Sequence, residues 1–261
     1  MVRGPQSERG TDRAFLQRDA YADSTKLRAR GSIYRYRDPP GAIGPWVLAH
    51  LDLRAGDRLL DVGCGPGAYL ALLPDGVRGV GADLSFGMAS EAHAHAHAPT
   101  VNADVAQLPF PPATFDHVIA PHMLYHCPDL TAALVELRRV MTPPGTFLAV
   151  TNGPDHLQEL WDLHEDVTGT RPPLVSDRFD LDNGTAALRA HFATVTVHHF
   201  SGTVAVPDAS LVREYYASLQ HFAGIDGRAV LDALEARVQR TIDEHGAFRA
   251  RTHSGALVCT D

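Results

Sequence analysis

One short stretch of the sequence decides the expected fold: Leu59-Leu60-Asp61-Val62-Gly63-Cys64-Gly65-Pro66-Gly67. It predicts an apolar strand with an acid at its carboxyl end, followed by glycines at alternate positions. Such glycines let the backbone adopt positive φ and approach a ligand closely. The run 68–73 is expected to open a helix whose N-terminus points at that ligand. The stretch therefore predicts a site for a cofactor that carries adenosine.

Asp61 distinguishes between two such cofactors, because they differ in charge. A dinucleotide presents a pyrophosphate, which a neighbouring carboxylate would repel. S-adenosylmethionine has no phosphate and carries a sulfonium and an ammonium, so a carboxylate can hold its aminoacyl end directly or through water. The glycines alone are weak evidence, since Gly63, Gly65 and Ala68 also satisfy the loose dinucleotide pattern G-x-G-x-x-G/A. A strand-to-helix turn without any ligand is the plain alternative.

Four later segments continue this pattern along the chain, namely 80–85, 102–110, 115–120 and 137–148. Together with 59–67 they resemble the class I S-adenosylmethionine-dependent methyltransferases of the small-molecule type, most closely those of quinone biosynthesis and actinobacterial natural products. In that resemblance they correspond to the first motif, the end of the second strand, the adenine-side loop, the fourth strand, and the helix, turn and fifth strand that follow. The resemblance is specific for the cofactor and says little about the methyl acceptor.

The resemblance implies an α/β fold: a Rossmann-like seven-stranded, mostly parallel sheet with an antiparallel last strand and a helical lid. Strand and helix signals alternate between 58 and 151, as parallel βαβ units require. The expected organisation is a flexible tail over 1–18 and a methyltransferase domain over 19–261. Within that domain, an N-terminal cap at 19–52 and lid elements within 154–224 are expected to cover the cofactor and supply the acceptor pocket.

Composition narrows the function classes. The net charge of −8 argues against a broad nucleic-acid surface, because phosphate binding needs clustered Lys and Arg. No targeting segment or long apolar run is found, so a cytoplasmic protein without membrane contact is expected. The three cysteines are far apart in sequence and are expected to be free thiols. The tract 92–98, with histidine at alternate positions, is expected to be a solvated helix end and not a metal site.

Acids at successive strand ends are expected to hold the cofactor. Asp83 is expected to accept hydrogen bonds from the ribose hydroxyls, with capping of the next helix beside Ser85 as an alternative that can coexist. Asp104 is expected to accept from the adenine amino group. Leu84 and Phe86 either flank the adenine or belong to the core. The full set expected to bind S-adenosylmethionine is Asp61, Gly63, Cys64, Gly65, Gly67, Asp83, Leu84, Asp104, Val105, Ala120 and Pro121.

Candidates for the catalytic step follow the fourth strand. His122 and His126 are the leading bases or orienting groups, because a neutral imidazole can accept a proton near pH 7. Either imidazole could instead hydrogen-bond only to loop backbone. Tyr21 in the N-terminal cap is expected to touch the methionine moiety or the acceptor, and Tyr36 and Lys26 are weaker candidates. Aromatic and imidazole groups for the acceptor, or for the core, are His156, Trp161, His164, Tyr215, Tyr216, His221 and Phe222.

The predicted function is methyl transfer from S-adenosylmethionine to a small-molecule acceptor at oxygen, nitrogen or carbon, in specialised metabolism, by a monomer or homodimer. A nucleic-acid (RNA) methyltransferase is disfavoured by the acidic balance, and residues 120–123 lack the Asp/Asn-Pro-Pro-Tyr/Phe sequence. A dehydrogenase would explain neither Asp61 nor Asp104. A protein of the same fold that binds the cofactor without methyl transfer stays open.

Overall fold

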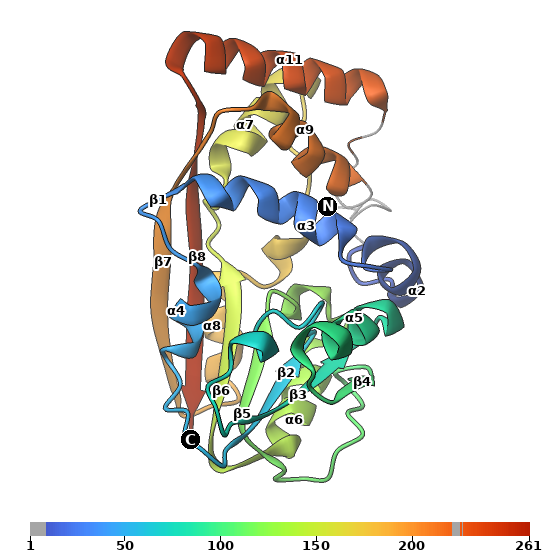
Figure 1. Ribbon diagram of the computed structural model, residues 1–261, viewed down its shortest axis with the longest axis vertical. Helices are drawn as coiled ribbons and strands as arrows, with labels where there is room; N and C mark the ends of the chain where they lie inside the picture. The colour runs from blue at the N-terminus through green and yellow to red at the C-terminus, as the bar shows by residue number, and fades with distance from the viewer. Residues whose placement is uncertain (1–8, 221–224, 226) are drawn as a thin grey trace.

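The computed structural model describes residues 9–220, 225 and 227–261, and its centre is one eight-stranded sheet (Figure 1). The strand order is β1-β7-β8-β6-β5-β2-β3-β4. The strands are β1 Arg37–Asp38, β2 Arg58–Val62, β3 Arg78–Asp83, β4 Thr100–Asn102, β5 Phe115–Pro121, β6 Met141–Asn152, β7 Thr194–Val206 and β8 Phe248–Thr260.

The sheet has a parallel half and an antiparallel edge. Strands β4, β3, β2, β5 and β6 pair in parallel, whereas the last strand, β8, runs antiparallel to both β6 and β7. The expected mostly parallel sheet with an antiparallel last strand is therefore confirmed. The two-residue strand β1 adds an eighth strand, because it pairs antiparallel with the outer edge of β7.

Helices surround the sheet: α2 Arg13–Phe15, η1 Leu16–Ala20, α3 Thr25–Gly31, η2 Ser32–Tyr36, α4 Ile43–Leu48, η3 Leu70–Leu72, α5 Phe86–Ala96, η4 Leu124–His126, α6 Leu130–Val140, α7 Gln158–Thr168, η5 Val175–Arg178, α8 Leu181–Arg189, α9 Ala209–Ser218 and α11 Arg228–His245. Side chains of Ser85, Asp129 and Asp180 cap the N-termini of α5, α6 and α8 by accepting from backbone amides.

Two clusters of buried apolar side chains sandwich the parallel strands. On one face, α4 packs Val47 against a cluster that includes Leu59 of β2. On the other face, α6 packs Leu134 against a cluster that includes Leu60. Adjacent residues of β2 thus point to opposite faces, and both are fully buried, which explains the continuous apolar run in that strand.

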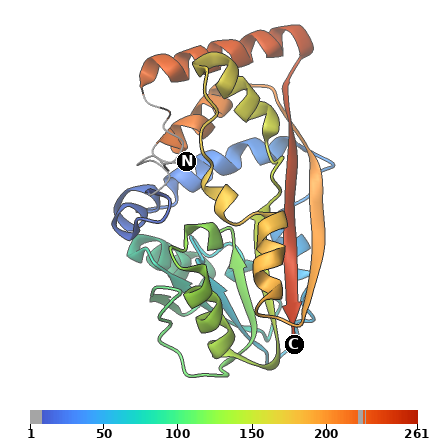
Figure 2. The same ribbon diagram turned by 180° about the vertical axis from the view of Figure 1, so that it is seen from behind.

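A helical lobe stands beyond the carboxyl ends of the parallel strands (Figures 1 and 2). It contains α3, α7, α9 and α11, and the long strands β7 and β8 extend into it. Its own apolar cluster is built around Trp161, Tyr216 and Leu234, with Phe248 contributed by β8. Of the helices of this lobe, α7 and α9 fall within the expected lid region 154–224, α3 falls within the expected N-terminal cap, and α11 lies outside both.

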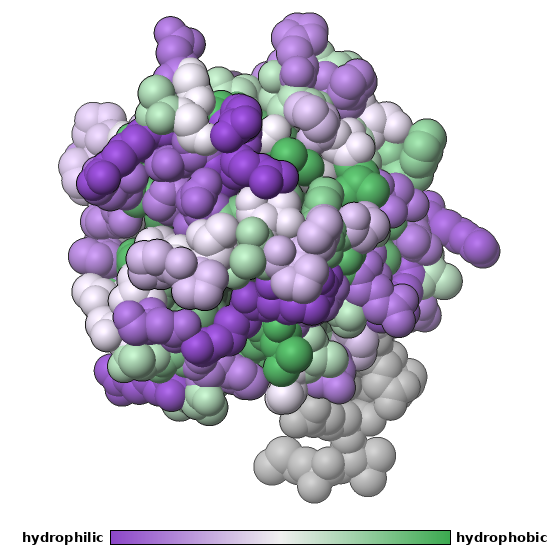
Figure 3. Space-filling model, turned by 90° about the horizontal axis from the view of Figure 1, so that it is seen from below, coloured by the Kyte–Doolittle hydropathy of each residue, from purple (hydrophilic) through white to green (hydrophobic). Residues whose placement is uncertain are grey.

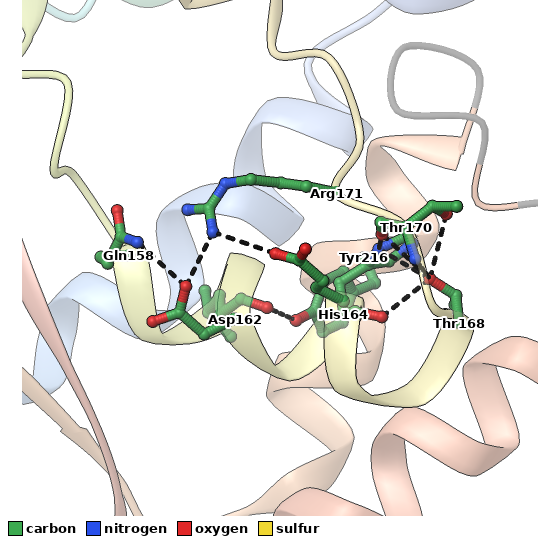
Figure 4. A network of polar contacts seen from close by, with 9 residues as sticks. Gln158, Asp162, His164, Thr168, Thr170, Arg171 and Tyr216 are labelled. Atoms are coloured by element: carbon green, nitrogen blue, oxygen red, sulfur yellow. Dashed lines mark hydrogen bonds and ion pairs between the residues drawn. The ribbon is translucent and has the colours of Figure 1, made fainter.

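Polar contacts close the segment after α7 (Figure 4). Asp162 accepts from Gln158 at 2.9 Å and from Arg171 at 2.7 Å. The His164 imidazole contacts the Thr170 carbonyl at 2.9 Å, which folds the chain back onto the end of the helix. Gly169 takes the left-handed conformation at the C-cap, as such a reversal favours. These contacts fix the chain reversal that follows α7.

The N-terminal segment lies against the sheet domain. Residues 1–8 of the expected tail lie outside the described residues, and helical turns begin at Arg13 after Asp12 caps them. Leu16 is buried, and Gln17 donates to the Leu84 carbonyl at 3.0 Å. This segment thus reaches the end of β3.

The molecular surface is mixed in character. On the face seen in Figure 3, hydrophilic side chains separate small apolar areas. Large apolar side chains that are exposed include Leu72, Val135 and Phe86. Among the described residues, no helix is both long and apolar enough to cross a lipid bilayer.

Candidate active site

The glycine stretch forms a tight turn directly after β2. Gly63 has φ 67° and its amide donates to the Ala82 carbonyl of β3 at 2.7 Å. A Cβ at Gly63 would lie 2.7 Å from Cβ of Met123, and one at Gly67 would lie 3.0 Å from the backbone of Ala92. Glycine is therefore required both for conformation and for space.

The helix expected over 69–73 is wrong. The structure has turns over 66–69 and only the 3-10 helix η3, Leu70–Leu72. Leu73 adopts extended backbone because Pro74 follows, and a residue before proline avoids the helical region. No long helix dipole therefore points at the turn, and its amides and nearby side chains form the site.

A cavity of about 280 Å³ opens above this turn, at the carboxyl ends of β2, β3 and β5. Ligands of open α/β sheets bind at this edge. Eight of the expected cofactor residues line it: Gly63, Cys64, Gly65, Asp83, Leu84, Asp104, Val105 and Pro121. The other three, Asp61, Gly67 and Ala120, are not among the lining residues.

Asp61 is buried beside the turn without a hydrogen-bond partner. The residue is 0% exposed, and neither carboxyl oxygen has a partner in the structure. Burial, and secondarily the charge of Asp83, raises the pKa of Asp61 to about 8. The Tyr69 hydroxyl, also buried and unpaired, has its pKa raised by burial and then by the Asp61 charge. An unpaired buried carboxyl is costly, and a cationic group is its natural complement.

Asp83 holds the turn together and faces the cavity. Its two carboxyl oxygens accept from the amides of Gly65 at 2.9 Å and Ser85 at 2.8 Å. Burial raises its pKa, and these two hydrogen bonds act in the opposite direction. Ser85, in turn, caps α5 by accepting from Met88. Asp83 thus supports the turn, while capping of α5 itself belongs to Ser85.

Asp104 lies at the far end of the cavity and is already paired. One oxygen accepts from the Ala106 amide at 2.8 Å, and the other forms an ion pair with Arg13 of the N-terminal segment. Leu84 lines the same cavity, whereas Phe86 is 74% exposed and contributes to neither cavity nor core. A ligand group that used Asp104 would share it with Arg13.

Tyr21 and His126 form a hydrogen-bonded pair in the cavity wall. The Tyr21 hydroxyl lies 2.8 Å from Nε2 of His126, and Nδ1 of His126 lies 2.7 Å from the Gly10 carbonyl. Because a carbonyl only accepts, Nδ1 carries the proton and Nε2 accepts from the tyrosine. Burial lowers the pKa of His126 to about 4, so the imidazole is neutral.

The His122 imidazole, unlike that of His126, is not held by hydrogen bonds to other described residues. Its backbone takes a positive φ of 52°, and its amide donates to the Val150 carbonyl at 2.8 Å. The imidazole lines the cavity, and none of the hydrogen bonds of the described side chains involves it. Burial lowers its pKa to about 4. A neutral imidazole with a free nitrogen is suited to contact a ligand.

A second cavity of about 120 Å³ lies in the helical lobe and shares Tyr21, Arg30 and Tyr125 with the first. His156, Trp161 and Tyr215 line it, as expected for acceptor contacts. The others lie elsewhere: the described Lys26, Tyr36, His164 and Tyr216 line neither cavity, and His221 and Phe222 are outside the described residues.

Sequence reasoning missed the side chains that the N-terminal segment brings into the site. Arg13 and Arg30 line the first cavity although they precede the glycine turn by many residues. Tyr125, between the two predicted histidines, lines both cavities. Only the position of Tyr125 within the segment after β5 was a usable signal.

The histidines of the tract 92–98 bond to backbone. His93 and His95 contact the carbonyls of Ala98 and Pro66, and His97 is the left-handed C-cap of α5. Among the described residues, no group of His, Cys, Asp or Glu is arranged to hold a metal ion. The three cysteines are free and buried.

The strand order, the glycine turn and the cavity at the strand ends define a Rossmann-like methyltransferase fold. Residues 60–149 match the family described as methyltransferase domain. The predicted class of protein is thereby confirmed.

Relatives and solved structures agree with this assignment. A malonyl-[acyl-carrier protein] O-methyltransferase from Legionella pneumophila is 39% identical over 110 residues, which are 40% of this chain and 39% of that protein. One of the same name from Methylovorus is 29% identical over 218 residues, 74% and 72% of the two chains. The fold resembles phosphoethanolamine N-methyltransferase 2 of Haemonchus contortus in complex with S-adenosyl-L-methionine, with TM-score 0.56, 20% identity and coverage of 95% and 60%.

Proposed function

We propose that this protein transfers a methyl group from S-adenosylmethionine to a small-molecule acceptor. The observation that carries the proposal is the unpaired, fully buried carboxyl of Asp61 beside the glycine turn. The ammonium of S-adenosylmethionine would stabilise the ionised form of this carboxyl, whereas a pyrophosphate would disfavour that form. The family match over 60–149 and the cofactor named for the Haemonchus structure support the same ligand.

The residues present fit this cofactor. Asp61 would attract the aminoacyl end, Asp83 would accept from ribose hydroxyls, and Asp104 would accept from the adenine amino group in exchange for part of its contact with Arg13. When bound, S-adenosylmethionine supplies a methyl group on a positively charged sulfur, a good leaving group. The protein then has mainly to orient a nucleophile and exclude water.

His122 is the proposed acceptor-side residue. Its neutral imidazole faces the cavity and can accept a hydrogen bond or a proton from an acceptor hydroxyl or amine. The Tyr21–His126 pair is proposed to close the wall beside it, since both nitrogens of His126 are engaged. The lid cavity is proposed to hold the acceptor body among Trp161 and Tyr215.

The remaining assignments belong to the same proposal. The domain is taken as 19–261 with the cap and lid boundaries given above, and residues 9–18 of the expected tail pack against it through Leu16, Arg13 and Gln17. The protein is taken to act in the cytoplasm as a monomer or homodimer in specialised metabolism. The relatives named above act on malonyl groups carried by a protein, which keeps a carrier-bound acceptor as a second form of the small-molecule class.

The proposal is tested with Asp61→Asn, which removes the charge and keeps the shape. We expect about tenfold weaker binding of S-adenosylhomocysteine and unchanged binding of 5′-methylthioadenosine, which lacks the aminoacyl group. Calorimetry measures both, and Asp52→Asn, an exposed acid paired with Arg54, is the control. Equal affinity of the wild type and Asp61→Asn for S-adenosylhomocysteine would contradict the assignment.

A further inference from the structure

Arg30 lies at the point where the two cavities meet. It is the penultimate residue of α3, is half-buried, and lines both the cofactor cavity and the lid cavity. Its Nη1 donates to the Ser218 carbonyl of α9 at 3.2 Å, which fixes the side chain. Its Nη2 is buried and has no hydrogen-bond partner. One nitrogen of the guanidinium therefore lacks a hydrogen-bond acceptor beside the two cavities.

Arg30 lacks a directly paired carboxylate. In the part of the chain that the structure describes, no carboxylate forms an ion pair with it. The charge of Arg30 acts to lower the pKa of four tyrosine hydroxyls, whereas burial raises the pKa of each by more. These tyrosines are Tyr21, Tyr34, Tyr125 and Tyr215. The guanidinium centre lies 5.5 Å from the centroid of the Tyr21 ring. A buried guanidinium nitrogen without a hydrogen-bond acceptor is costly, and an anion would satisfy it.

We propose that Arg30 binds a carboxylate of a bound ligand at this junction, an inference that rests on the proposed function. A guanidinium pairs with carboxylates through strong, directed hydrogen bonds. A carboxylate fits better than a dianionic phosphate, because Arg30 is one positive charge and Asp177 and Asp180 line the lid cavity. Asp83 adds a further negative charge on the cofactor side.

Two ligands have a carboxylate that can reach Arg30. The first is the cofactor, because Arg30 lines the same cavity as the glycine turn beside Asp61, so a cationic and an acidic group are present for the two charges of a zwitterionic amino acid end. The second is the acceptor, because Arg30 also lines the lid cavity. The shared chemistry is a monoanionic carboxylate, and the two sources are separated by experiment.

The experiment compares wild type, Arg30→Gln and Arg30→Lys by calorimetry, with melting temperatures to confirm folding. Arg35→Gln is the control, since Arg35 is exposed and bonds only to the Ser32 carbonyl in its own helix. In one arm, the probes are S-adenosylhomocysteine and its decarboxylated analogue, S-adenosylthiopropylamine. In the other, protein saturated with S-adenosylhomocysteine is titrated with benzoate and with neutral benzamide.

The expected result is a preference of about tenfold or more for the carboxylate probe in one arm, lost in Arg30→Gln and partly kept in Arg30→Lys. Such a preference in the first arm would show that Arg30 binds the carboxylate of the cofactor. The same preference in the second arm would show that it binds a carboxylate of the acceptor. If wild type binds S-adenosylhomocysteine but Arg30→Gln alters neither preference, the inference is overturned while the proposed function stands. If wild type fails to bind S-adenosylhomocysteine, the proposed function fails, and benzoate on the cofactor-free protein still tests Arg30.

Discussion

Single residues explain what the cavity selects. The buried Asp61 carboxyl has no hydrogen-bond partner among the described residues. Both carboxyl oxygens of its neighbour Asp83 accept hydrogen bonds from backbone amides. Asp61 is therefore available to a cationic group of a ligand, while Asp83 stabilises the glycine turn. Burial, and secondarily the charge of Asp83, raises the pKa of Asp61, and a bound cation would favour its ionised form.

The shift of Asp61 makes a prediction about pH. Folded protein keeps this proton up to pH about 8, whereas the unfolded chain releases it near 3.8. Between these values the unfolded state binds fewer protons, so the free energy of unfolding falls as pH rises, by up to about 1.4 kcal/mol per unit. The Asp61→Asn variant has no titrating group at this position, so its stability lacks this dependence on pH. Thermal unfolding from pH 5 to 8, without ligand, should show wild type losing stability relative to the variant; parallel curves would refute the shift.

His122 gives a prediction about turnover. Because its imidazole faces the cavity without a protein partner, His122→Ala should lower kcat by about tenfold to a hundredfold while changing cofactor affinity by less than about threefold. Steady-state methyl transfer to any acceptor used by the wild type measures the first, and calorimetry the second. His245→Ala, at an exposed helix end, is the control. A fully active His122→Ala would remove this residue from the mechanism.

Motif residues could be predicted from sequence because their positions follow from local geometry. Asp83 and Pro121 stand at strand ends, and parallel strands bring those ends to one edge. Arg13 and Arg30 could not be placed, since they belong to short helices whose docking depends on contacts remote in sequence, such as Arg30 with Ser218.

At the scale of elements, the positions of the parallel strands were predictable, whereas the lengths of the antiparallel strands β7 and β8 were not. Continuous apolar runs such as 58–62 indicate buried parallel strands, and they occur where expected. Strands β7 and β8 are each 13 residues long, because they form a long antiparallel ladder with each other. That pairing is decided by the partner strand and leaves little local signal.

The glycine turn gives a prediction about stability. Gly63→Ala places a Cβ against Met123 at a positive φ, so it should destabilise the fold by about 1–3 kcal/mol and weaken cofactor binding. Gly31→Ala, in α3 with nothing near its Cβ, should be neutral or slightly stabilising. Urea unfolding of both variants checks this. Equal stability of the two would show that the turn tolerates a side chain.

At the scale of the whole molecule, the sheet domain supplies the cofactor cavity and the helical lobe supplies a second cavity that opens into it. The N-terminal segment contacts the sheet domain through Arg13 with Asp104, Gly10 with His126, and Gln17 with Leu84, and α3 contacts α9 through Arg30 and Ser218. The sheet domain could be predicted because its motif recurs in a fixed order. The lobe could not, since its helices are held by apolar contacts that many amphipathic sequences would satisfy.

The most direct measurement of the central claim is calorimetry of the intact protein with S-adenosylmethionine, S-adenosylhomocysteine and NAD. A carboxyl that repels pyrophosphate and attracts an ammonium predicts binding of the first two ligands and none of NAD. Tight binding of NAD together with no binding of S-adenosylmethionine would contradict the account.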